Sequence, residues 1–235
     1  MIAPGRVVVR WTTIERVEQV DPDLERDLGP DDARRATEFG AAGARAAFAV
    51  GRRMRDDVLS RTLGVEAGAL RFAIGTRGKP SLAEPADVDL AFNLSHSHGV
   101  VALAVARTRD LGLDVEAVRP LPAAARLAQR FLAPAERDAV MRRRDADRTR
   151  AFLTVWTRKE AWLKATGRGL SVHLSAVEVE PDPDRRPVLL ALPEGCGDPT
   201  DWSMRTVPLP VNAVATVCLP TGDWRLDVAE WHPPV

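Results

Sequence analysis

Two carboxylates, Asp114 and Glu116, stand one residue apart in the otherwise apolar run Leu111-Gly112-Leu113-Asp114-Val115-Glu116. In a β-strand, residues i and i+2 point to the same face, so these two acids would project side by side, opposite the apolar positions. Neighbouring carboxylates repel each other unless a cation lies between them. Mg²⁺ commonly takes one or two carboxylates together with substrate phosphate oxygens. The pair therefore indicates a divalent-metal, phosphate-handling site, and a solvated edge strand with two exposed acids is the alternative.

A third carboxylate, Glu160, lies in the predicted helical segment Trp156-Thr157-Arg158-Lys159-Glu160-Ala161-Trp162-Leu163-Lys164. Glu160 and Lys164 are four residues apart and share one face of a helix. An ordinary surface Glu–Lys pair beside core tryptophans is the alternative. Together with the acid pair, this segment favours Glu160 as a further metal ligand and Lys164 as a phosphate contact.

A strand ending in Asn93-Leu94-Ser95-His96-Ser97-His98 offers hydroxyl, imidazole and backbone N–H groups that suit a phosphate. Three other interpretations stay open. His96 and His98 have a spacing that could bind zinc, but no further His or Cys stands near them in the sequence. Ser95 or Ser97 could be a hydrolase nucleophile, but the glycine-flanked turn of such a site is missing. The segment could also be a turn without function.

The composition limits the class of protein. The 235 residues carry a formal net charge of zero, so a large basic surface for nucleic acid is not expected. Cys196 and Cys218 form neither a disulfide framework nor a metal motif. No apolar run reaches the length of a membrane span, and the first residues lack the layout of a signal peptide. We therefore expect a cytoplasmic protein with no membrane or nucleic-acid partner.

The elements that would position these residues alternate between strands and helices. Strands are predicted at 7–11, 70–74, 88–93, 100–106, 111–116 and 211–219, and helices at 30–63, 122–132, 134–144 and 147–166. The strands at 100–106 and 111–116 are expected to pair as a hairpin. The tail at 231–235 is expected to be loose.

A faint internal repeat accompanies this pattern. Leu28, Pro30 and Asp32 correspond to Leu132, Pro134 and Glu136, and residues 45–53 echo residues 150–158, at an offset of 104 or 105 residues. Chance matches between Ala/Arg-rich helices are the alternative. If the repeat is real, the chain is an α+β protein of two similar halves, residues 1–106 and 107–235. The cleft between them would be the natural ligand site, and one fused chain suggests a monomer.

Four motifs in order resemble those of the 4′-phosphopantetheinyl transferase superfamily, in its Sfp-type branch with two tandem halves. They are Gly78-Lys79-Pro80, Phe92-Asn93-Leu94-Ser95-His96-Ser97, Leu111-Gly112-Leu113-Asp114-Val115-Glu116 and residues 152–170. The resemblance covers about residues 28–180. It implies transfer of the phosphopantetheine arm of coenzyme A to a serine of an apo acyl or peptidyl carrier protein, with release of adenosine 3′,5′-bisphosphate.

The resemblance also implies a role for each matching residue. Asp114, Glu116 and Glu160 would hold Mg²⁺, with Mn²⁺ as an alternative. Glu160 would help to deprotonate the acceptor serine, and Lys164 would stabilise the leaving group. Coenzyme A would be bound by the remaining candidates, which are Lys79, Pro80, Ser95, His96, Lys159, Arg45 and Arg52.

Two points bear on whether the roles of the family apply to this chain. His98 stands where the family often has a smaller residue. A coenzyme A-binding module without turnover is the alternative function, although such a module would not need all of Asp114, Glu116, Glu160 and Lys164.

Overall fold

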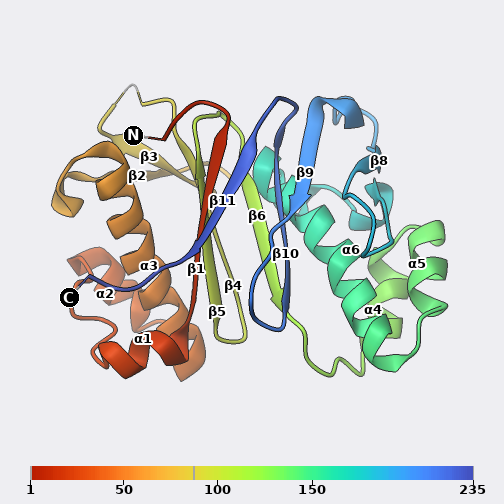
Figure 1. Cartoon of the computed structure of the whole chain (residues 1–235), viewed down its shortest axis with the longest axis horizontal. Helices are drawn as coiled ribbons and strands as arrows, with labels where there is room; N and C mark the ends of the chain where they lie inside the picture. The colour runs from red at the N-terminus through yellow and green to blue at the C-terminus, as the bar shows by residue number, and fades with distance from the viewer. Residues whose placement is uncertain (1, 87, 235) are drawn as a thin grey trace.

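In the computed structural model, which describes residues 2–86 and 88–234, the strands lie in the middle and the helices cover the two outer sides (Figure 1). This confirms the predicted α+β class. Each half has a long helix packed on a sheet, and buried side chains fill the space between the two sheets.

The first half is built on a four-stranded sheet in the order β11-β1-β5-β4. Its strands are β1 (Arg6–Thr13), β4 (Ala91–Ser97), β5 (Val100–Ala106) and β11 (Arg225–Glu230). The buried strand β5 has apolar side chains on both faces. Val101, Leu103 and Val105 pack toward α3 (Ala42–Leu63), while the intervening alanines pack toward the second sheet. The remaining elements are α1 (Ile14–Val20), α2 (Pro30–Ala36), β2 (Arg71–Ile74) and β3 (Pro80–Glu84).

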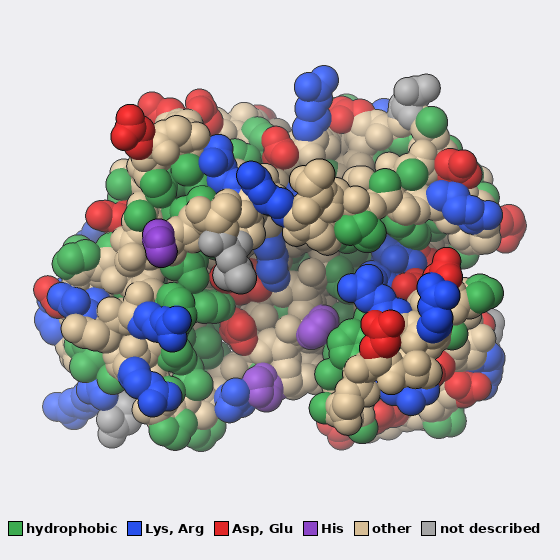
Figure 2. Space-filling model, turned by 180° about the vertical axis from the view of Figure 1, so that it is seen from behind, with side chains coloured by type: hydrophobic (Ala, Val, Ile, Leu, Met, Phe, Trp, Pro, Cys, Tyr) green, Lys and Arg blue, Asp and Glu red, His purple; other side chains and the backbone are tan. Residues whose placement is uncertain are grey.

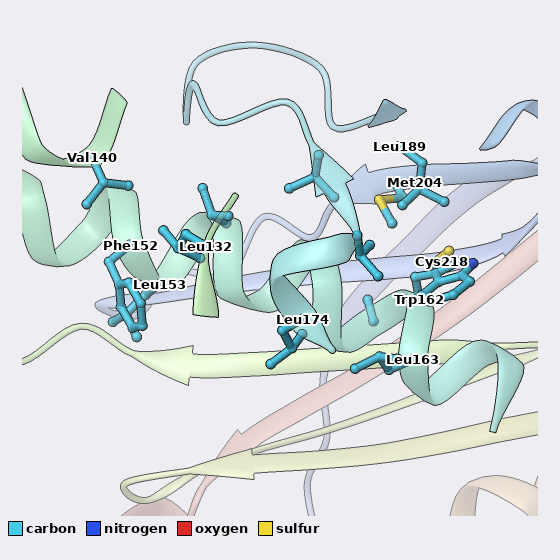
Figure 3. Close-up of a cluster of buried hydrophobic side chains, with 14 of the residues drawn as sticks. Leu132, Val140, Phe152, Leu153, Trp162, Leu163, Leu174, Leu189, Met204 and Cys218 are labelled. Carbon is cyan, nitrogen blue, oxygen red and sulfur yellow. The ribbon is translucent and has the colours of Figure 1, made fainter. Parts of the chain in front are cut away.

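The second half has a three-stranded sheet in the order β6-β10-β9. These strands are β6 (Gly112–Ala117), β10 (Ala213–Pro220) and β9 (Trp202–Thr206). The helix α6 (Asp145–Thr166) packs on this sheet through a buried cluster that includes Trp162 and Met204 (Figure 3). The smaller elements are α4 (Ala124–Phe131), α5 (Pro134–Met141), β7 (Glu178–Val179) and β8 (Leu189–Ala191).

The internal repeat is visible as a repeat of architecture. The order β1-β5-β4 in the first half matches β6-β10-β9 in the second, and all four pairings are antiparallel. Pro30 and Pro134 are the first residues of α2 and α5, where proline costs no hydrogen bond. The helices α3 and α6 are each 22 residues long and end at Gly64 and Gly167, both left-handed. The two halves are therefore similar units.

Two predicted elements were wrong. The strands at 100–106 and 111–116 do not form a hairpin, because β5 pairs with β1 and β4 while β6 pairs with β10. The hairpin partner of β5 is β4, and His98 and Gly99 form the turn with φ of 43° and 85°. Positive φ at both central residues is the geometry that tight hairpins favour. The helix predicted over 30–63 is two helices, α2 and α3, separated at residues 37–41.

The C-terminal segment crosses back to the first half. β11 pairs in parallel with β1, so residues 225–230 join the first sheet although they belong to the predicted second half. The loose tail was also a wrong prediction at Trp231, which is 4% exposed. Its backbone N–H donates to Trp11 O over 2.7 Å, and its Nε1 donates to Asp57 Oδ2 over 2.8 Å. In residues 2–86 and 88–234, no helix has the length and apolarity that crossing a membrane requires.

Candidate active site

The two sheets meet where β4 runs beside β6, and polar side chains of β4 replace the usual backbone pairing. Asn93 Oδ1 accepts a hydrogen bond from Leu113 N over 2.8 Å, and Ser95 Oγ accepts one from Val115 N over 3.1 Å. Both side chains are buried, and buried backbone N–H groups need such partners. The result is that β4 fixes the position of the strand that carries the two acids.

The next hydrogen bonds link the same strand to the acids themselves. Ser95 Oγ donates to Asp114 Oδ1 over 3.0 Å, and Ser97 Oγ donates to Glu116 Oε2 over 2.5 Å. Because Ser95 and Ser97 alternate on β4 as Asp114 and Glu116 do on β6, each serine faces one acid. The predicted side-by-side arrangement of the acids follows from this register.

Gly112 allows α6 to lie directly against the acid-bearing face of β6. A Cβ atom at this position would lie 1.9 Å from Ala161 O and 2.4 Å from Ala165 N, both in the backbone of α6. A side chain here would therefore push the helix away. With glycine, α6 comes close enough for Lys164 Nζ to reach Asp114 Oδ1 at 2.6 Å and Ser95 Oγ at 2.9 Å.

The three acids share an environment that disfavours their charges. Burial raises the pKa of Asp114, and the neighbouring Lys164 acts in the opposite direction. Burial also raises the pKa of Glu116 and of Glu160. For Glu160, the negative charges of Asp114 and Glu116 raise the pKa further. Glu160 lies one turn before Lys164, whose Nζ contacts Asp114, so it belongs to the part of α6 that faces the two acids of β6.

The donor set fits a divalent cation, although the described residues do not form a ready-made cage. Within residues 2–86 and 88–234, no three His, Cys, Asp or Glu side chains are grouped closely enough to hold a metal ion. The buried atom Asp114 Oδ2 nevertheless has no hydrogen-bond partner. Carboxylate oxygens with raised pKa values are groups that a hard cation such as Mg²⁺ would stabilise. In this structure the ammonium of Lys164 supplies the positive charge at Asp114.

His96 and Lys79 border this cluster from the first half. His96 follows Ser95 on β4 and is exposed, and the surrounding protein and the positive charge of Lys164 lower the pKa of its imidazole. Lys79 Nζ donates to Ala165 O, near the C-terminal end of α6, over 2.7 Å. A cation is favourable at the C-terminus of a helix. Lys79 thus connects the turn before β3 to α6, and burial lowers the pKa of its ammonium.

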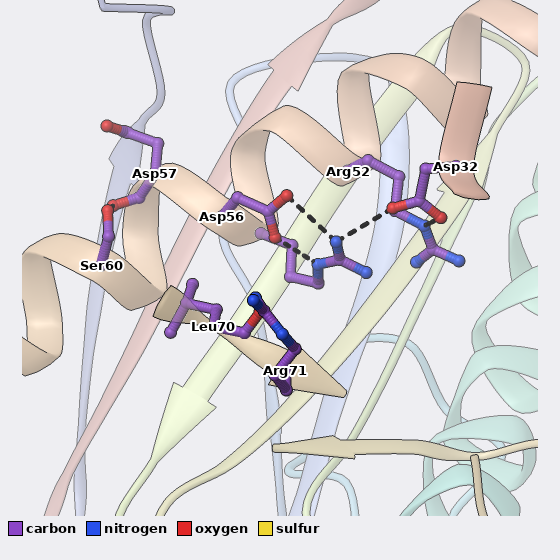
Figure 4. A network of polar contacts seen from close by, with 8 residues as sticks. Asp32, Arg52, Asp56, Asp57, Ser60, Leu70 and Arg71 are labelled. Atoms are coloured by element: carbon purple, nitrogen blue, oxygen red, sulfur yellow. Dashed lines mark hydrogen bonds and ion pairs between the residues drawn. The ribbon is translucent and has the colours of Figure 1, made fainter. Parts of the chain in front are cut away.

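Pro80 and Arg52 lie farther from the acids, on the first half. Both line a cavity of about 1390 Å³ between α2, α3 and β2. Arg52 Nε donates to Asp32 Oδ1 over 3.1 Å, within a network that spans α2 and α3 (Figure 4). Arg45 lies about two turns earlier on α3 and pairs with Glu25 at 2.5 Å. The structure does not bring either arginine to Asp114, and carboxylates occupy both guanidinium groups.

Lys159 is not placed with the other candidates, which corrects the expectation of a phosphate contact. Its side chain is 0% exposed, and its Nζ lies 2.5 Å from Glu136 Oε2 of α5. A helix turns by about 100° per residue, so adjacent residues cannot both face the acids. Glu160 takes the face toward β6, and Lys159 is turned into the protein interior.

The rival interpretations of the histidine segment gain no support. His98 has a positive φ, is exposed, and its Nδ1 lies 3.2 Å from Ser97 Oγ. No zinc-type group of side chains occurs in the described part of the chain. Ser95 Oγ donates to Asp114 and accepts from Lys164 and from Val115 N, so no imidazole is among these partners to take its proton as in a Ser-His-Asp triad.

Three positions that shape the cluster were not among the predicted site residues, although Asn93 and Ser97 stood in one of the motifs. They are Asn93 and Ser97, which hold β6 and Glu116, and Gly112, which admits α6. A glycine inside an apolar strand often marks the close approach of another backbone, and this signal was present in the sequence. Figure 2 shows that the surface is hollowed between the two halves, with acidic, basic and histidine side chains along the hollow.

Comparison with known proteins shows the family of this chain. A family model described as the 4′-phosphopantetheinyl transferase superfamily matches residues 110–221, which include β6 and α6. The 4′-phosphopantetheinyl transferase HetI of Nostoc sp. (strain PCC 7120) is 34% identical over 220 residues, covering 93% of this chain and 89% of HetI. The 4′-phosphopantetheinyl transferase Sfp of Bacillus subtilis (strain 168) is 28% identical over 137 residues, 58% of each chain.

Among solved structures, the holo-[acyl-carrier-protein] synthase of Thermotoga maritima matches with 22% identity and a TM-score of 0.36, covering 46% of this chain and 61% of the other. That score is too low to support an argument about function. The extended match to HetI decides the family. This chain belongs to the 4′-phosphopantetheinyl transferase superfamily.

Proposed function

We propose that this protein transfers the 4′-phosphopantetheine arm of coenzyme A to a serine hydroxyl of an apo acyl or peptidyl carrier protein. The observation that carries the proposal is the meeting of Lys164, Asp114 and Ser95 where α6, β6 and β4 converge. This cluster combines buried acids with a lysine, which suits the chemistry of a pyrophosphate. A single chain supplies all three elements, so we propose that the protein acts as a monomer.

The divalent cation is part of the same proposal. Asp114, Glu116 and Glu160 would hold Mg²⁺, or Mn²⁺ in its place. When bound, such an ion neutralises phosphate charge. The unpartnered Oδ2 of Asp114 and the raised pKa values of the three acids support this assignment.

The side chains would divide the reaction between them. The serine oxygen of the carrier forms a bond to the phosphorus that bears pantetheine, and the bond from that phosphorus to adenosine 3′,5′-bisphosphate breaks. Glu160, whose pKa is raised, would accept the serine proton. Lys164 would leave Asp114 for the departing phosphate and stabilise its charge.

The first half would bind the nucleotide part of coenzyme A. Ser95 and His96 would contact its phosphates, Lys79 and Pro80 would line the pocket, and Arg52 would contribute from the adjoining cavity. Arg45 is retained as a weaker candidate because Glu25 already pairs with it. Lys159 has no part in this pocket, because it is buried against Glu136.

One experiment tests the transfer and separates it from the alternative, a coenzyme A-binding module. The protein is incubated with coenzyme A, Mg²⁺ and several apo carrier proteins, and each carrier is weighed intact. We expect the mass of one phosphopantetheine to be added to at least one carrier. Coenzyme A binding by calorimetry without any mass increase would favour the binding module.

Asp114→Ala and Asp138→Ala form a matched pair for the same assay. Asp138 is an exposed aspartate on α5 with an ion pair of 3.8 Å to Arg137 and no contact with the site. Asp114→Ala should abolish transfer while the protein stays folded, and Asp138→Ala should leave it unchanged. Full activity of Asp114→Ala would show that the metal assignment is wrong.

A further inference from the structure

Two oppositely charged side chains are buried together on the face of α6 that does not contact β6. Lys159 is 0% exposed, Glu136 of α5 is 2% exposed, and Lys159 Nζ lies 2.5 Å from Glu136 Oε2. Lys159 precedes Ala161, which contacts β6 at Gly112, by two residues, or about 200° around the helix. The pair therefore lies away from the acids, although Lys159 is the sequence neighbour of Glu160.

Hydrogen bonds hold both groups from several directions. Lys159 Nζ also donates to Leu174 O over 2.9 Å and to Phe131 O over 3.5 Å. Glu136 Oε2 accepts from Ala133 N and Glu136 Oε1 accepts from Val179 N, each over 2.8 Å. An ammonium has three donors, and each has a partner here. The pair thereby connects α6 to the end of α4, the start of α5, the turn at 174–176 and β7.

The opposite face of α6 meets β6 backbone to backbone at its closest approach. Where α6 crosses β6, the surface of the strand is the bare backbone of Gly112. On that face Lys164 bonds to Asp114 and Ser95 within the site, and Thr157 Oγ1 lies 3.3 Å from Thr216 Oγ1 of β10. The buried pair on the far face adds directional contacts from outside the site, and hydrogen bonds are more directional than apolar packing.

A buried ion pair is a weak way to gain stability. Removing two charges from water costs free energy that their attraction does not reliably repay, and an apolar pair of similar volume is often as stable or more so. What the charged pair adds is a defined geometry. The arrangement matters because a change in the rotation of α6 moves Glu160 and Lys164 relative to Asp114.

We propose that Lys159 and Glu136 are positioning residues that set the rotation of α6, so that Glu160 and Lys164 face the acids of β6. The inference rests on the roles proposed for Glu160 and Lys164. Neither Lys159 nor Glu136 touches the substrate. Their loss should lower turnover while leaving the binding of coenzyme A nearly intact, because the proposed nucleotide contacts lie on the first half.

The test compares Lys159→Met, Glu136→Gln and the double variant Lys159→Met/Glu136→Gln. Each single variant leaves one buried group without its partner and should lose thermal stability. The double variant removes both charges and should recover most of that stability. We expect its kcat for transfer to stay at least tenfold below wild type, with KM for coenzyme A within about twofold.

Arg158→Met is the matched control on the same helix. Arg158 is also fully buried, but its guanidinium donates to the carbonyls of Glu180, Asp182 and Arg185, all in one loop after β7. A single loop can move together with α6 if the helix rotates. The four separate elements bonded to Lys159 and Glu136 oppose such a rotation. Arg158→Met should lower the melting temperature and keep kcat within about twofold.

Two outcomes would overturn the proposal. They are a wild-type kcat in the double variant, or an equal loss of kcat in Arg158→Met. If the double variant does not fold, Glu136→Asp replaces it, because it keeps the charge but draws the carboxylate back by one methylene. It should lower kcat with KM unchanged, and a wild-type kcat would again contradict positioning. No mass increase on any carrier with the wild-type protein would instead contradict the proposed function, so the two failures are distinguishable.

Discussion

Lys164 Nζ lies 2.6 Å from Asp114 Oδ1, so the lysine of α6 already neutralises an acid that we propose as a metal ligand. The two residues come from α6 and β6 and are 50 positions apart in the chain. Asp114 Oδ2 is left without a hydrogen-bond partner on the other side of the same carboxylate. A divalent cation entering this site therefore meets a competing ammonium.

Replacing Lys164 should tighten metal binding and slow transfer. In Lys164→Met the ammonium no longer competes, so the affinity of the coenzyme A-free protein for Mn²⁺ should rise about tenfold, a change of about 1.4 kcal/mol. Titration calorimetry with Mn²⁺ measures this without any turnover. Transfer should fall, because the leaving phosphate loses its cation.

Arg119→Met is the control that distinguishes competition between Lys164 and the metal ion from a general effect of removing a positive charge. Arg119 acts on Glu116 only through its charge and forms no contact with Asp114. Its loss should raise the Mn²⁺ affinity by less than about twofold. Equal effects of the two variants, or an unchanged affinity in Lys164→Met, would show that Lys164 does not compete with the ion.

Gly112→Ala should separate the helix from the strand. The added Cβ would lie 1.9 Å from Ala161 O, and this backbone carbonyl cannot turn aside as a flexible side chain could. Overpacking of this kind should lower the free energy of unfolding by about 2–3 kcal/mol. Transfer should also be lost because Lys164 is displaced with α6. Urea unfolding and the mass assay measure the two effects.

Gly43→Ala is the matching control for this substitution. Gly43 lies in α3, and nothing lies within 4 Å of an added Cβ. Alanine is the better helix former, so this change should be neutral or slightly stabilising. A Gly112→Ala protein with wild-type stability and activity would mean that α6 does not rest on this glycine.

The stability of the metal-free protein should fall as pH rises above the ordinary carboxyl range. The pKa values of Asp114, Glu116 and Glu160 are raised in the folded state, mainly by burial. At pH values between the unfolded-state and the folded-state pKa of each acid, the folded protein therefore binds more protons than the unfolded chain. Their contribution is present below the unfolded values near 3.8 and 4.5 and is lost as pH rises through the folded values.

Mg²⁺ should offset this loss because it binds the ionised acids. We expect Mg²⁺ to raise the melting temperature more at pH 8 than at pH 5, as measured by thermal scanning at both values. The Mg²⁺ effect should disappear in Asp114→Asn. A Mg²⁺ effect of equal size at both pH values would contradict the assignment of these acids as ligands.

Trp231→Ala should destabilise the first half, although the residue lies at the end of the chain. The indole is 4% exposed, and its Nε1 donates to Asp57 Oδ2 of α3. Truncation of a buried tryptophan costs about 3–5 kcal/mol. Denaturant unfolding measures the loss, and His232→Ala, at an exposed neighbouring position, should have little effect. Similar unfolding curves for the two variants would mean that the tail is not anchored.

Much of the local structure followed from patterns in the sequence. The alternation of Leu113, Asp114, Val115 and Glu116 separates an apolar face from an acidic one, and the structure keeps that separation. Proline at the start of α2 and α5 and glycine after α3 and α6 marked real helix ends. Such features depend on neighbours a few residues apart, and the sequence displays those directly.

The pairing of strands was beyond these patterns. Residues 100–106 and 111–116 are close in sequence, and a short turn made a hairpin the natural expectation. Instead β5 lies between β1 and β4, and β6 pairs with β10 about 100 residues later. An alternating apolar pattern shows which face of a strand is buried. It does not show which neighbouring strand pairs with either edge, so it fits both possible partners equally well.

By itself, the sequence determined that Asp114 and Glu116 share a strand face and that Glu160 and Lys164 share a helix face, because both follow from the fixed periods of local backbone geometry. The tertiary structure decided which of these faces meet. The backbone contact at Gly112 brings Lys164 to Asp114, while the same helix turns Lys159 inward to Glu136. The difference is physical. Which face of α6 meets β6 depends on how closely two distant backbones can approach, and that is a property of the packed molecule.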